Sequence, residues 1–138
     1  MAMIAVDPEG ARPAPTRARV AVTLMLHAFV IWGLCGVTVA IGTNVTSQAN
    51  ALLAHAIAAP LIAATVSSFY FSRFRYTAPL PTASLILAFI ALLDFFLVAL
   101  VINRSLAMFR SFAGTWLPFT LIFGAVYLTG VAMTRSRR

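Results

Sequence analysis

The sequence predicts an all-α, polytopic membrane protein, folded as an antiparallel bundle of four transmembrane helices with both termini in the cytoplasm. The chain is 62% hydrophobic and only 9% charged, whereas a soluble domain carries roughly a quarter charged residues. Four long apolar runs are free of Lys and Arg, and residues 20–72 contain no charged side chain. With ~20 residues needed for each crossing, a chain of 138 residues has little left for an extramembrane domain.

The first half of the chain divides into a leader and two helices. Residues 1–19 are polar and proline-containing, and we expect a flexible cytoplasmic leader there. The first helix is predicted over 20–41, because ~22 apolar residues reach ~33 Å, which crosses the membrane and exceeds a cleavable signal segment. A polar, uncharged joint follows, and the second helix is predicted over 50–71 with Asn50 as its N-cap.

The second half repeats this pattern with basic joints. The third helix is predicted over 80–102, where Pro81 suits the first turn. A joint containing Arg104 and Arg110 leads to the fourth helix over 112–133. The four-helix domain therefore covers 20–134, and residues 135–138 form a basic cytoplasmic tail.

The positions of the arginines predict the orientation. The net charge of +7 comes without any lysine. By the positive-inside rule the end of the bundle with more arginines faces the cytoplasm. Only Arg104 and Arg110 belong to the other end. The eight arginines at the end expected to face the cytoplasm are Arg12, Arg17, Arg19, Arg73, Arg75, Arg135, Arg137 and Arg138. Because they flank apolar runs, we interpret them as topology signals and lipid headgroup contacts, and expect no nucleic-acid binding.

Asp94 is the single acid inside an apolar run, and it is the candidate site. An acid at that depth costs ~2.5 to 3.5 kcal/mol, so it must face protein or water. One hypothesis is a polar pocket in the outer half of the bundle, with Asp94 as proton or cation acceptor, His55 from a neighbouring second helix as relay, and Arg104 or Arg110 at the mouth. Another is an ion pair with Arg110 that holds helices three and four together. A third is a protonated acid that donates one interhelical hydrogen bond.

The other reactive residue types predict no chemistry. Cys35 is the lone cysteine, which excludes an intrachain disulfide, a CxxC redox pair and a thiolate cluster. His27 and His55 fall at different depths, so we expect no shared metal or haem, and an interhelical hydrogen bond for His27. Catalytic residues, cofactors and metals are therefore not expected, and the chain is not expected to be an enzyme.

Small residues on the second helix predict close packing. Ala59, Ala63 and Ser67 recur every four residues, which lets another helix approach. A lipid-facing position for this stripe is the alternative.

The segments 53–76 and 94–130, and within them DFFLVALVINRS and FRSFAGTWLPF, resemble small four-helix inner-membrane proteins of bacteria. The resemblance implies a multi-pass protein of the bacterial inner membrane with the same helix count, and it implies no catalytic residue. The chain lacks the membrane glutamate of small multidrug resistance exporters and the pore motif of fluoride channels. We expect a structural or accessory role with the lipid bilayer, a homo-oligomer or a larger membrane complex as partner. The alternative is a small proton- or cation-coupled transporter that uses Asp94.

Overall fold

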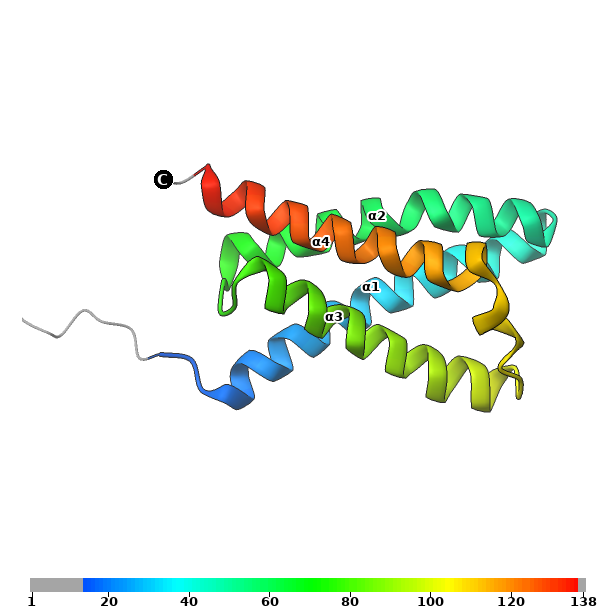
Figure 1. Cartoon of the computed structure of the whole chain (residues 1–138), viewed down its shortest axis with the longest axis horizontal. Coiled ribbons are helices and arrows are strands. Elements are labelled where there is room, and N and C mark those ends of the chain that lie inside the picture. The colour runs from blue at the N-terminus through cyan, green and yellow to red at the C-terminus, as the bar shows by residue number, and fades with distance from the viewer. Residues whose placement is uncertain (1–13, 137–138) are drawn as a thin grey trace, which may run out of the picture.

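A computed structural model describes residues 14–136, and every regular element in them is helical (Figure 1). Four helices are long and apolar enough to cross a membrane, as the sequence predicts. The elements in chain order are α1 (Arg17–Val45), α2 (Gln48–Arg73), α3 (Pro79–Leu93), its continuation η2 (Asp94–Ile102), η3 (Ala107–Arg110), η4 (Phe112–Trp116) and α4 (Leu117–Arg135). Of the predicted leader and tail, residues 1–13 and 137–138 lie outside the described residues, and residues 17–19 belong to α1.

The helices extend further into the polar joints than predicted, because hydroxyl side chains there cap them. Thr16 Oγ1 accepts the Arg19 amide hydrogen at 3.2 Å, which starts α1. Ser47 Oγ accepts the Asn50 amide hydrogen at 3.3 Å, so Ser47 is the N-cap of α2. The prediction of Asn50 as the cap is therefore wrong. With the cap at Ser47, only residues 46–47 separate α1 from α2.

The order of the helices around the bundle differs from the chain order. The principal neighbours of α1 are α2 and α3, and those of α4 are also α2 and α3. Consequently α2 and α3 lie diagonally opposite each other, and the expectation that they are adjacent is wrong. Figure 1 shows α1 and α3 crossing near their middles, so their ends diverge.

A close approach at the α2–α3 joint accounts for this order. Gly130 of α4 lies between the end of α2 and the start of α3, where a Cβ would come within 2.6 Å of Phe71 and 2.8 Å of Pro79. Arg75, in the joint, has a positive φ of 49°. Its Nε donates to the Phe71 carbonyl at 2.6 Å and its Nη2 to the Met133 carbonyl at 3.0 Å. The last turns of α4 therefore separate α2 from α3.

Apolar side chains lie both inside and outside the bundle. The interior is built largely from small residues, and the stripe of Ala59, Ala63 and Ser67 is fully buried in it, as predicted for close packing. Large apolar side chains remain on the exterior, where Leu61 and Leu128 are each 64% exposed. Small residues thus line the α2 stripe, large side chains such as Tyr70 and Phe71 fill other parts of the interior, and many large apolar residues lie on the outer surface.

The end of the bundle that contains Arg75 is closed by aromatic rings. His27 lies among Phe69, Tyr70 and Phe74, with ring centroids 5.4 to 6.0 Å apart. Its Nδ1 lies 2.7 Å from the Thr23 carbonyl oxygen one turn earlier on α1. The hydrogen bond of His27 is therefore within its own helix, not between helices as expected.

Candidate functional site

Asp94 lies where the third helix changes its hydrogen-bonding pattern. From Asp94 to Ile102 the chain forms π-helical turns, the type of turn in which an amide bonds to the carbonyl five residues earlier. The last of these bonds joins the Asn103 amide to the Val98 carbonyl at 2.8 Å. A second π segment, η4, precedes α4. Such turns are rare and often occur at functional sites, so both segments mark this half of the bundle.

The carboxylate of Asp94 accepts a hydrogen bond from α1. Trp32 Nε1 donates to Asp94 Oδ1 at 2.8 Å, which joins α1 to α3 near their crossing. Among residues 14–136, Trp32 is the only side chain that forms a hydrogen bond with this carboxylate. The expected ion pair with Arg110 is therefore not formed there, and Arg104 and Arg110 are exposed in the joint that precedes η4. An indole donor satisfies one oxygen but leaves the acid without a counter-charge.

Asp94 borders a cavity of about 450 Å³, in the half of the bundle for which the sequence suggested a polar pocket. All four helices contribute to its wall. It extends from Trp32 and Ile122 near the middle of the bundle to Gln48 and Asn103, which are exposed at the joints. The cavity therefore connects a half-buried carboxylate with one end of the molecule.

His55 lines the same cavity from α2, the helix diagonal to α3. Its side chain is only 8% exposed, and Nδ1 is buried without a hydrogen-bond partner in the described part of the chain. The structure thus brings His55 and Asp94 to one cavity. The two side chains face the cavity from diagonally opposite helices, and the cavity lies between them.

Hydroxyl groups contribute less to the cavity than their number suggests. Thr115 lines it, but its Oγ1 already donates to the Met108 carbonyl at 2.8 Å. Ser111 also lines it and accepts the Gly114 amide hydrogen at 3.0 Å. These bonds hold the joint against η4, and the ionisable side chains of the wall are Asp94, His55 and Cys35.

Two important lining residues, Trp32 and Cys35, were not predicted as part of the site. Trp32 had a detectable signal, because an indole N–H inside an apolar run requires an acceptor and Asp94 is the strongest one available. Cys35 is buried, lies almost one turn after Trp32 and shares the cavity wall. Nothing in the sequence distinguishes it from an ordinary buried apolar residue.

The lining of the cavity suits the binding of a ligand. One carboxylate among mostly apolar walls suits a positively charged or hydrogen-bond-donating group attached to an apolar body. Among residues 14–136 no three His, Cys, Asp or Glu side chains are close enough to hold a metal ion. Comparisons with protein-family models, with curated proteins and with solved structures found no match to this chain.

Proposed function

We propose that the chain is a multi-pass protein of the bacterial inner membrane, with four crossings and both termini in the cytoplasm. The apolar exterior supports this proposal. Leaving a side chain such as Leu61, Val101 or Leu128 in water forgoes about 1.5 to 3 kcal/mol of burial free energy, and lipid supplies that burial. The arginine distribution supports the orientation. Reporter fusions at the two termini test it, since an external reporter at either end contradicts the proposal.

We further propose that the protein binds a small cation in the Asp94 cavity and carries it in a proton- or cation-coupled cycle. The observation that carries this proposal is a half-buried carboxylate, with one neutral hydrogen-bond partner, in the wall of a cavity that reaches the end of the bundle. An acid inside a span faces water, protein or a cation, because ionisation in hydrocarbon is costly. A cation beside Asp94 supplies the counter-charge that Trp32 cannot. No catalytic step is part of this proposal.

The dimensions of the cavity agree with binding of a small solute. Its volume of about 450 Å³ falls within the ~300 to 1,000 Å³ that is usual for small-molecule sites. His55 on the opposite wall supplies a second titratable group for proton coupling. A homo-oligomer is compatible with this function, because each chain contains its own cavity.

A structural or accessory role is the second candidate, and the Trp32–Asp94 hydrogen bond favours it. In this role the acid exists to hold α1 against α3 within a larger membrane complex. Interhelical hydrogen bonds in membrane proteins contribute ~0.6 kcal/mol on average and up to ~1.7. The bond is therefore strong enough to orient two helices and too weak to determine the fold alone.

Two substitutions separate the candidates. Asp94→Asn removes the charge but retains an oxygen that accepts from Trp32, whereas Trp32→Phe removes the donor and retains the charge. The assay is binding of the lipophilic cation tetraphenylphosphonium to detergent-purified protein by calorimetry, with unfolding measured on the same samples. A carrier predicts that Asp94→Asn loses binding at unchanged stability and that Trp32→Phe still binds.

The structural role predicts the reverse pattern. No variant and no wild-type protein binds the cation, and Trp32→Phe lowers the unfolding free energy by about 1 kcal/mol. Flux in proteoliposomes completes the test. A wild-type protein that binds the cation but moves neither it nor protons refutes the carrier cycle and retains only the binding site.

A further inference from the structure

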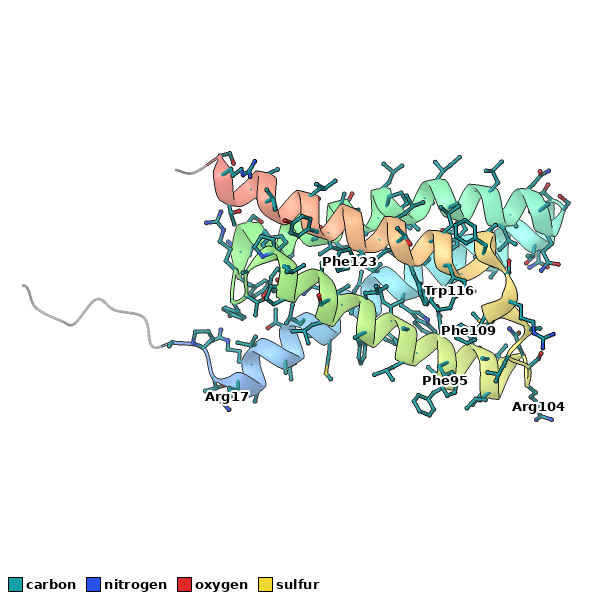
Figure 2. The ribbon with its side chains drawn as sticks, in the orientation of Figure 1. Arg17, Phe95, Arg104, Phe109, Trp116 and Phe123 are labelled. Carbon is teal, nitrogen blue, oxygen red and sulfur yellow. The ribbon has the colours of Figure 1, made fainter. Side chains whose placement is uncertain are left out.

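A second hollow lies on the outside of the bundle, along the seam between α3 and α4. This groove has a volume of about 520 Å³. Small residues of α3 form its floor, among them Ser84, Ala88 and Ala91, and aromatic rings form its sides. Figure 2 shows four of these rings, Phe95, Phe109, Trp116 and Phe123, following the seam toward the end of the molecule where Arg104 lies.

The aromatic sides of the groove are held in place. Trp116 Nε1 donates to the Phe109 carbonyl at 2.9 Å, which ties η3 to the start of the fourth helix. The ring centroids of Phe95 and Phe109 lie 6.1 Å apart across the groove end. The groove is therefore a formed feature of the fold, with its outer end set by the joint.

The length of the groove matches one leaflet of a bilayer. On the third helix its lining residues run from Ser84 of α3 to Phe95 of η2, which is roughly 16 Å at the helical rise per residue. A hydrocarbon core is ~30 Å thick, so the groove covers about half of it. A groove of this length accommodates one acyl chain and is too short for the full contact of a membrane-crossing partner helix.

Charge at the outer end of the groove identifies the headgroup. Phe109 lines the groove, and Arg110 follows it directly in η3. Arg104 lies in the same joint and is exposed. The single acid of residues 14–136 is Asp94, which faces the internal cavity and accepts from Trp32. These two arginines thus have no acidic partner in the described part of the chain, and an anionic phosphate supplies one.

We propose that this groove binds one anionic phospholipid, with an acyl chain along α3 and the phosphate at Arg110. The proposal rests on the membrane crossings proposed above and is independent of the internal cavity. It gives a function to Arg110, which lies at the non-cytoplasmic end, where the positive-inside rule predicts few basic residues. The aromatic rings bury the chain, and the guanidinium group selects the charge.

The test is native mass spectrometry of the purified full-length protein titrated with phosphatidylglycerol or with phosphatidylcholine. Wild-type protein should retain phosphatidylglycerol about fivefold more strongly, because one arginine near a lipid surface contributes about that factor. Arg110→Gln should remove this preference. Arg73→Gln, a matched change at the other end of the bundle, should leave it intact.

A second pair of variants tests the acyl chain. Ala88→Phe, or the milder Ala91→Leu should the first variant fail to fold, fills the groove and should lower retention of both lipids several-fold. Equal retention of both lipids by wild-type protein, or no effect of Arg110→Gln or of groove filling, overturns the proposal. Equally strong retention of glycerol 3-phosphate would show a phosphate site without an acyl chain, which also overturns it. A protein that is monodisperse without detergent would instead refute the membrane crossings.

Discussion

The contact at Gly130 gives the most direct test of the helix order. A Cβ at this position would lie 2.6 Å from Phe71 Cζ, 2.7 Å from Phe71 Cε2 and 2.8 Å from Pro79 Cβ. The first distance is about 0.8 Å shorter than the 3.4 Å at which ordinary contact begins. Phe71 is fully buried, so its ring has no free space to enter. Gly130→Ala must therefore push α4 away from α2 and α3.

The expected cost combines two opposing effects. Overpacking in a well-packed interior costs about 1 to 3 kcal/mol. Alanine favours a helix over glycine by about 1 kcal/mol, which offsets part of that cost. Gly130→Ala should thus lower the unfolding free energy by up to about 2 kcal/mol. Gly124→Ala is the matched control on the same helix, because nothing lies within 4 Å of its built Cβ, and it should be neutral or slightly stabilising.

The assay is reversible unfolding in mixed micelles, followed by tryptophan fluorescence as the denaturing detergent is increased. Phe71→Leu provides a second step, because a smaller side chain relieves the overlap with a Cβ at 130. The double variant should then be more stable than the sum of the two single effects predicts. Equal stability of Gly130→Ala and Gly124→Ala, or strict additivity with Phe71→Leu, would refute the wedge of α4 between α2 and α3.

Two further predictions concern the joints. Gly42→Val should destabilise the protein by about 2 kcal/mol in the same assay, because a Cβ there would meet the facing Cβ of α2 at 2.8 Å; Gly36→Val, which has open space, should not. Arg75→Gln should speed hydrogen exchange in the last turns of α4, because Nη2 loses the Met133 carbonyl, a bond of about 1 kcal/mol. Arg73→Gln should leave that exchange unchanged, and equal effects of the two arginine variants would contradict the role of Arg75.

Helix existence was predictable from the sequence, and helix order was not. Each of the four apolar runs has the length that a membrane crossing requires, so four helices were predictable from run length and composition. The neighbours of each helix depend on which of its faces packs against the other helices. Large apolar residues such as Leu26, Val30 and Leu34 remain exposed along α1, while Ile31 is buried among them. Because both the exposed and the buried positions are apolar, periodicity carries almost no signal of which face packs.

The sequence identified Asp94 as the candidate site, but it did not identify the hydrogen-bond partner of Asp94. Asp94 was identifiable as the one acid in an apolar run, and His55 lines the same cavity. Because an acid inside an apolar run calls for a cationic partner, the sequence favoured an ion pair with Arg110. The structure supplies an indole instead, since Trp32 reaches the carboxylate without crossing the joint. The π turns that begin at Asp94 were not predicted, because the apolar run continues through them without a proline or a glycine to mark a change.

Phe119 separates the two hollows, because its ring lines both the internal cavity and the outer groove. Phe119→Ala should join them and give Cys35, which also lines the cavity, a second and shorter path to the surface besides the opening at Gln48 and Asn103. The measurement is the rate at which N-ethylmaleimide modifies this lone cysteine in detergent-purified protein, and it should rise several-fold. Phe123→Ala truncates a ring that lines only the groove and should leave the rate unchanged. A similar rate in both variants would show that more than one side chain separates the cavity from the outer groove.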